Sequence, residues 1–365
     1  MGFNPLRVGV IGASSTYGWA RNSHLPALIG LPDLELLSVC TAHEKTASES
    51  AEIFGVRNSF YDYRDMLKDP DLDAVVVSVR VPYHHQLTMD VLRAGKHVYT
   101  EWPLGSNSFE AKQMSEFAKS AKVKNMVGLQ ARAEPVFLMA KEMLEDGYVG
   151  EVLSSRMTLF APGILSRTSL DMWQSNKGKG ANTFTILFGH ALDALCMCLG
   201  EVREISAILS TQVDKWEAVD TRQVFDVDSP DNVLVHGILE TGSVISMHVA
   251  TVPWHGSGYC FEIYGSMGTL VLEAPNHVQL GNLTLRGSNS KNRELTLFQI
   301  PDRFKWIPCE LQHGTVFNVA QMWRKFAESI RTGKSIQPDF DLAVHRHVLM
   351  DAIERASYTG ERQIL

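Results

Sequence analysis

Apolar residues are spaced in two different patterns along the 365-residue chain. Over the first 130 residues, short strand-like runs alternate with segments of helical spacing. These apolar runs lie at residues 8–12, 34–40, 73–79, 97–100 and 125–129. Runs rich in valine that alternate with helices are typical of parallel strands covered on both faces. The pattern therefore predicts an α/β protein that begins with a doubly wound parallel sheet, a Rossmann domain, over residues 1–130.

The spacing of apolar residues changes after residue 151, where strand-like runs follow one another with turns between them. These runs lie at residues 152–160, 204–212, 232–239, 243–249, 260–264 and 269–273, and helical segments are expected at 183–199, 316–332 and 342–359. We expect a second α/β domain over residues 131–365 with a large open mixed or antiparallel sheet. Its last helices can pack back on the first domain. Residues 177–180 and 286–293 are expected to be loops.

Charge and cysteine content exclude several classes of protein. The 34 Lys and Arg residues against 41 Asp and Glu residues give a net charge of −7, which argues against a nucleic-acid binder with a basic face. The five cysteines are irregularly spaced, so we expect no metal site and a reducing, cytoplasmic compartment. The longest apolar run, 184–199, contains His190 and Asp193 and is shorter than a membrane span of about 20 residues, so no membrane association is expected.

A glycine-bearing loop follows the first predicted strand. Glycine at residue 12 allows a sharp turn, so that a pyrophosphate can approach backbone N–H groups at a helix N-terminus. Ser14 stands where a second glycine is usual, and Gly18 comes one residue late for the third. A tight turn without a ligand is the alternative interpretation. If the loop binds a dinucleotide, the expected contacts are Gly12, Ser14, Ser15, Gly18 and Trp19.

The end of the second predicted strand bears on cofactor choice. NAD sites usually carry an acid there that binds the ribose diol, and this chain has Thr41. His43 and Lys45 add positive charge nearby, so the sequence favours NADP(H) over NAD(H). The alternative is that these are solvated residues at a helix start and that the ribose is held in another way.

Several segments in order resemble the Gfo/Idh/MocA oxidoreductases, which include glucose–fructose oxidoreductase and inositol dehydrogenase. The matching segments are VGVIG at 8–12, HLPAL at 24–28, DAVVVS at 73–78, VPYH at 81–84, AGKHV at 94–98 and EWPL at 101–104, with 178–193 and 262–270 beyond them. The resemblance implies a dinucleotide cofactor, a small polyhydroxylated substrate and a sheet that packs in a homodimer or a dimer of dimers. A closer likeness is to the branch with the fungal galactose-pathway repressor, which binds a dinucleotide but acts through an activator protein.

Two departures from the family pattern affect the expected chemistry. The family usually has lysine where this chain has Trp102, and an indole N–H cannot exchange a proton usefully with a substrate hydroxyl. The family's usual aspartate before the helix histidine is Ile186 here. His190 and Asp193 remain, three residues apart on a predicted helix, so that both can face one side. We expect His190 to be the acid/base and Asp193 to orient it, unless His190 is simply a histidine of the packed core.

The remaining candidate contacts come from strand ends and aromatic residues. The nicotinamide half of the cofactor is expected to meet Val79, Pro82, His84, Glu101, Trp102 and Gln130. The substrate is expected to meet Trp102, Arg132, Trp173 and His190. Glu101 can instead be a plain strand-end acid, Arg132 can make a structural ion pair, and tryptophans are more often core residues.

Three functions fit these features. The first is an NAD(P)-dependent oxidoreductase that acts on a sugar, cyclitol or related polyol through His190, without the usual lysine. The second is a dinucleotide-binding co-regulator without turnover, which Trp102 and the repressor branch favour. The third, a hydrolase that oxidises a sugar transiently with tightly held NAD, has no specific support in the sequence.

Overall fold

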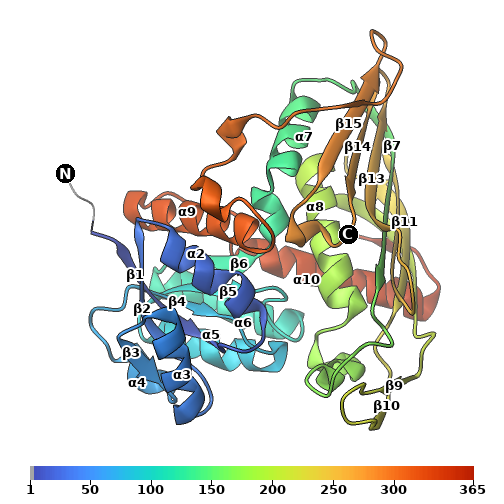
Figure 1. Cartoon of the computed structure of the whole chain (residues 1–365). Helices are drawn as coiled ribbons and strands as arrows, with labels where there is room; N and C mark the ends of the chain where they lie inside the picture. The colour runs from blue at the N-terminus through green and yellow to red at the C-terminus, as the bar shows by residue number, and fades with distance from the viewer. Residues whose placement is uncertain (1–3) are drawn as a thin grey trace. The chain divides into compact units, whose positions relative to one another are not determined.

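The computed structural model describes residues 4–365, which form two compact units (Figure 1). The first comprises residues 4–133 with Lys305–His345, and the second comprises Glu134–Phe304 with Arg346–Leu365. The sequence indicates a boundary at residue 130, whereas the compact unit ends at Ala133 and regains residues 305–345 from beyond the large sheet.

The first unit has a six-stranded parallel sheet in the order β3-β2-β1-β4-β5-β6. Its strands are β1 (Leu6–Ile11), β2 (Leu34–Cys40), β3 (Asn58–Phe60), β4 (Ala74–Val77), β5 (His97–Glu101) and β6 (Asn125–Gly128). The predicted doubly wound sheet is confirmed. The sequence pattern missed only β3, a three-residue edge strand without a buried side chain.

The helices of the first unit are α1 (Trp19–Asn22), α2 (His24–Gly30), α3 (Glu44–Phe54), α4 (Tyr63–Leu67), α5 (His84–Arg93), α6 (Ser108–Ala121) and α9 (Val316–Thr332). Helices α2 and α9 contribute to one apolar core with β1 and β5, although about 300 residues separate them in sequence (Figure 1). Trp323 and Phe326 of α9 are completely buried in it. Burial of each side chain of this size contributes about 1.5–3 kcal/mol, which explains why α9 belongs to this unit.

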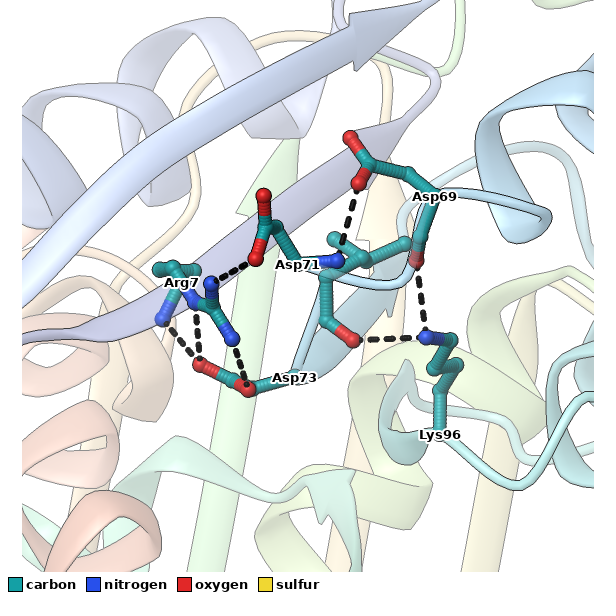
Figure 2. A network of polar contacts seen from close by, with 6 residues as sticks. Arg7, Asp69, Asp71, Asp73 and Lys96 are labelled. Atoms are coloured by element: carbon teal, nitrogen blue, oxygen red, sulfur yellow. Dashed lines mark hydrogen bonds and ion pairs between the residues drawn. The ribbon is translucent and has the colours of Figure 1, made fainter.

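A polar network joins the start of β1 to the start of β4 (Figure 2). The Arg7 guanidinium donates from Nε and Nη2 to the two carboxylate oxygens of Asp73, at 3.1 and 3.0 Å, and from Nη1 to Asp71 at 2.5 Å. The Lys96 ammonium donates to the carbonyl oxygens of Asp69 and Leu72. The network holds the turn before β4, and with it the register of the central strands.

Asp73 gives this network a pH dependence. Burial raises the pKa of the Asp73 carboxyl, but the hydrogen bonds from Arg7 outweigh burial and leave that pKa below its ordinary value. The stabilisation is therefore present above the ordinary pKa of an aspartate and is lost as pH falls through the lowered value. We expect Asp73→Asn to cost about 1 kcal/mol at pH 7 and much less in acid. Urea unfolding at both pH values measures this, with the more exposed Asp71→Asn as control; equal costs at both pH values would contradict it.

The second unit has a nine-stranded mixed sheet in the order β16-β15-β14-β13-β7-β12-β11-β8-β17. Its strands are β7 (Val152–Pro162), β8 (Val202–Ser210), β11 (Asn232–Leu239), β12 (Val244–Val252), β13 (Gly258–Gly265), β14 (Gly268–Ala274), β15 (Thr284–Asn289), β16 (Thr296–Leu297) and β17 (Gln363–Ile364), and β9 (Lys215–Glu217) pairs separately with β10 (Val224–Asp226). The large mixed sheet is as predicted. Residues 286–289, expected to be in a loop, instead lie in β15, because they pair with β14.

The helices of the second unit are α7 (Pro135–Glu145), α8 (Gly189–Leu199) and the larger part of α10 (Phe340–Thr359), which begins in the first unit. The expected helix over 183–199 is two elements, a π-helical segment (Thr183–Phe188) followed by α8. The Asn182 side chain accepts the Thr185 N–H and thereby caps the π-helical start. Across residues 4–365, the helices are all too short or too polar to span a membrane.

Candidate functional site

The turn after β1 brings together the ends of three strands. The N–H groups of Gly12 and Ala13 both donate to the carbonyl oxygen of Cys40, the last residue of β2. Gly12 has a φ of 95°, and a Cβ at this position would lie 2.2 Å from the carbonyl oxygen of Ser78, which follows β4. Only glycine fits there. Since the strand order reverses at β1, this turn occupies the position where doubly wound sheets bind ligands.

The rest of the loop presents backbone donors. Ser14 Oγ accepts the N–H groups of Thr16 and Tyr17 at 3.3 and 3.4 Å, so a bound anion would compete with this hydroxyl for two amides. A Cβ on Gly18 would meet no atom within 4 Å, although the φ of Gly18 is also positive. Residues 12–19 contain no carboxylate. This donor set fits the pyrophosphate of a dinucleotide, with Gly12 forming the cradle.

Sequence reasoning missed a cation beside the loop. Arg21 of α1 donates from Nε to the carbonyl oxygen of Ser15 at 2.6 Å, which holds its guanidinium against the loop. The nearby indole N–H of Trp19 is buried and has no hydrogen-bond partner among the residues described. The only feature of the sequence that could have indicated this role is the position of Arg21, three residues after Gly18.

The residues expected to select the cofactor lie where β2 ends and α3 begins. Thr41 Oγ1 lies 3.0 Å from the carbonyl oxygen of His43 and 2.6 Å from Thr46 Oγ1, so the hydroxyl is already held in the turn. The Lys45 side chain is 86% exposed and lies 3.8 Å from Glu49. No carboxylate occupies position 41, but the positive charge of Lys45 is partly balanced.

His84 links the segments that follow β4 and β5. Its Nε2 lies 3.0 Å from the carbonyl oxygen of Val79 and its Nδ1 lies 2.8 Å from that of Pro103. Burial lowers the pKa of the imidazole. Pro82 lies in the 3₁₀ turn Val81–Tyr83 that leads into α5. His84 therefore acts as an internal bridge that positions Val79, and a role in proton exchange is disfavoured.

Glu101 and Gln130 form a pair at the carboxyl ends of β5 and β6. The amide nitrogen of Gln130 lies 2.8 Å from Glu101 Oε2 and 3.1 Å from Oε1. His24 Nε2 lies 2.6 Å from Glu101 Oε1. The sequence indicated Glu101 and Gln130 separately and missed His24, whose only signal was a histidine in an apolar helix.

The other candidate substrate residues differ in their surroundings. Trp102 is 4% exposed, so its indole lies within the protein. Arg132 donates from Nη1 to the side-chain oxygen of Gln337 at 3.4 Å. Trp173 is half-buried in the 3₁₀ turn Met172–Ser175.

His190 and Asp193 lie on α8, directly after the π-helical segment, and both are buried. Such π segments are often found at functional sites. Asp193 Oδ1 accepts a hydrogen bond from Arg346 Nε at 2.9 Å. The guanidinium of Arg346 also donates from Nη1 and Nη2 to Glu201 at 2.6 and 2.7 Å. The expectation that Asp193 orients His190 stays a prediction, and Asp193 also has Arg346 as an ion-pair partner.

Within the first unit, the structure brings the Gly12 loop to the ends of β2 and β4, and Glu101 to Gln130. Thr41 belongs to the turn before α3, Lys45 lies in the first turn of α3, and His190 and Asp193 belong to the second unit. In residues 4–365, no three or more His, Cys, Asp or Glu side chains are grouped as a metal site would require.

Comparison with known proteins gives two family matches. Residues 6–129 match the model of an oxidoreductase family with an NAD-binding Rossmann fold, and residues 135–274 match the model of the Gal80p C-terminal domain. The chain is 32% identical over 287 residues to dehydrogenase aclE of Aspergillus oryzae, covering 74% of this chain and 77% of that protein. It is 24% identical over 319 residues to the galactose/lactose metabolism regulatory protein GAL80 of Saccharomyces cerevisiae, covering 80% and 72%.

A solved structure shares the fold over nearly the whole length. A levoglucosan dehydrogenase in complex with NADH and levoglucosan superposes with a TM-score of 0.87 at 24% identity, covering 99% of both chains.

Proposed function

Because the chain belongs to the Gfo/Idh/MocA oxidoreductase family, we propose that it is an NAD(P)-dependent dehydrogenase of a sugar, cyclitol or related polyol. The observation that carries the proposal is His190, a buried imidazole on α8 that follows a π-helical segment. Levoglucosan dehydrogenase and dehydrogenase aclE, which act as their names state, support the reaction class.

In this proposal the two units supply different parts of the reaction. A bound nicotinamide supplies the hydride acceptor or donor. The Gly12 loop holds the pyrophosphate through its backbone N–H groups and Arg21. His190 takes the proton from the substrate hydroxyl during oxidation and returns it during reduction. Arg346 joins α8 to Glu201 through Asp193, and so keeps His190 on a fixed helix.

Replacing His190 tests this assignment. Since no lysine stands at position 102, His190→Ala should lower kcat about 100-fold or more, the scale of a general acid–base group. Dinucleotide affinity should change only a few-fold, because the phosphates are held in the other unit. Steady-state kinetics and calorimetry measure the two quantities, and His236→Ala, an exposed histidine on β11, is the matched control. Unchanged kcat in His190→Ala would refute the role.

We further propose that NADP(H) binds more tightly than NAD(H), because no carboxylate at position 41 repels a 2′-phosphate. Thr41→Asp should lower NADP(H) affinity relative to NAD(H) by about 10-fold or more, since two anions would lie within a few ångströms. Thr41→Val removes the hydroxyl without adding charge and controls for the loss of its hydrogen bonds. Calorimetry with both dinucleotides measures the ratio; a ratio unmoved by Thr41→Asp would show that the ribose lies elsewhere.

A dinucleotide-binding regulator without turnover is the second candidate. It is favoured by the buried Trp102, where the family usually has lysine, and by the similarity to GAL80. Under this alternative the wild-type protein would bind a dinucleotide and oxidise no substrate. Trp102→Lys would then leave it inactive, whereas in an enzyme this change should retain or raise activity.

A further inference from the structure

The Glu101 carboxylate is held from several sides at the end of β5. His24 Nε2 lies 2.6 Å from Oε1, and the Gln130 amide nitrogen lies 2.8 Å from Oε2. Glu101 pairs with Gly128 across β5 and β6, and a Cβ at Gly128 would lie 2.2 Å from Oε2. The absent side chain at position 128 therefore makes room for the carboxylate.

A tryptophan from α9 settles which imidazole nitrogen carries the proton. The indole Nε1 of Trp323 lies 3.0 Å from His24 Nδ1. An indole N–H only donates, so Nδ1 must accept and the proton of the neutral ring must be on Nε2. Nε2–H then donates to Glu101. The chain of donors runs from Trp323 through His24 to Glu101, and both His24 and Trp323 are 0% exposed.

This arrangement holds the negative charge of Glu101 at a position from which solvent is largely excluded. Glu101 is 8% exposed, and N–H donors on both of its oxygens stabilise the ionised carboxylate. His24 is packed edge-on against Tyr99 and Trp323, with ring centroids 5.0 and 6.0 Å away, so it cannot turn away from Glu101 without disturbing the core.

The position of that charge relates it to a bound cofactor. In a doubly wound sheet, the half with β1 to β3 takes the adenosine and the half with β4 to β6 takes the other mononucleotide, both at the carboxyl ends of the strands. Glu101 ends β5 and Gln130 follows β6. The oxidised nicotinamide ring is a cation and the reduced ring is neutral, so a fixed carboxylate on this side attracts only the oxidised form.

We propose that Glu101 makes the dinucleotide site favour oxidised over reduced nicotinamide, and that His24 and Trp323 are positioning residues that hold its charge there. The inference rests on the proposed function, in that it requires a dinucleotide to bind. It adds residues from α2 and α9 to the site and assigns them a measurable effect, the ratio of the two dissociation constants.

Calorimetry with oxidised and reduced dinucleotide measures the ratio of the two dissociation constants in three variants. Glu101→Gln keeps the shape and removes the charge, and should shift the ratio toward the reduced form by about 10-fold, the scale of one partly screened charge pair. The side-chain oxygen of Gln130 has no hydrogen-bond partner in the described part of the chain, so its amide can turn to accept the new N–H. His24→Leu should shift the ratio in the same direction. His24→Gln should restore it, because its amide can donate to Glu101 and accept from Trp323.

Two controls separate this effect from damage to the fold. Glu52→Gln removes an exposed charge on α3 and should leave the ratio unchanged. Melting temperatures identify a variant that fails to fold. If His24→Leu fails to fold, Glu101→Gln alone tests the inference. A ratio within two-fold of wild type in Glu101→Gln would overturn the inference while leaving the proposed function intact. Failure of the wild type to bind either form would overturn both.

Discussion

Replacing Gly12 with alanine should reduce dinucleotide affinity by at least about 100-fold, or about 3 kcal/mol. A Cβ at this position would lie 2.2 Å from Ser78 O and 2.8 Å from the side chain of Val79. The turn can accept it only if the loop moves away from the end of β4, and that movement displaces the N–H groups offered to the pyrophosphate. Valine should have the larger effect. Calorimetry with NAD(H) and NADP(H) measures the loss.

Gly18→Ala is the matched control for this change. Gly18 also has a positive φ, 97°, but a Cβ there would meet no atom within 4 Å. Both variants carry the cost of a left-handed backbone, about 1–2 kcal/mol, and only Gly12→Ala carries the clash. Melting temperatures show how much of each loss is stability. Equal affinity losses in the two variants would contradict the proposal that Gly12 shapes the pyrophosphate-binding turn.

Replacing Arg346 with methionine should destabilise the second unit by about 3–5 kcal/mol, the usual cost of removing one partner of a buried ion pair. The Arg346 side chain is 1% exposed, and the change deprives Asp193, which is equally buried, of its ion-pair partner in this unit. Urea unfolding measures the cost. Arg355→Met, an exposed arginine on the same helix, should cost less than about 0.5 kcal/mol. A similar cost for both would mean that the Arg346 pairs add no stability.

Local patterns of apolar and polar residues were sufficient to predict most of the fold. β4 has the sequence Ala-Val-Val-Val and all four residues are buried, as a strand covered on both faces requires. The sequence allowed the last helices to pack back on the first domain but did not single out α9, because its Trp323 packs against β5 and α2 from about 220 to 300 residues away. The π-helical turns at 183–188 were also missed, since their apolar content does not distinguish them from α-helix.

The candidate site was predictable where backbone geometry defines it and unpredictable where distant charges meet. Gly12 follows from the strand-to-turn pattern alone. The partners of Glu101 and Asp193 do not, because His24 is 77 residues from Glu101 and Arg346 is 153 residues from Asp193. Helical spacing places Asp193 near His190, but it gives no sign of the ion pair that Asp193 also makes with Arg346.

The central claim is that the chain transfers hydride, and cofactor reduction by the wild-type protein tests it most directly. The protein would be mixed with NAD⁺ or NADP⁺ and a panel of sugars, cyclitols and polyols, and the absorbance of reduced nicotinamide would be followed. We expect at least one compound to reduce the cofactor with saturable kinetics, and His190→Ala to lower kcat about 100-fold or more. Tight dinucleotide binding without reaction of any compound in the panel, in either direction, would contradict the claim and favour the regulator.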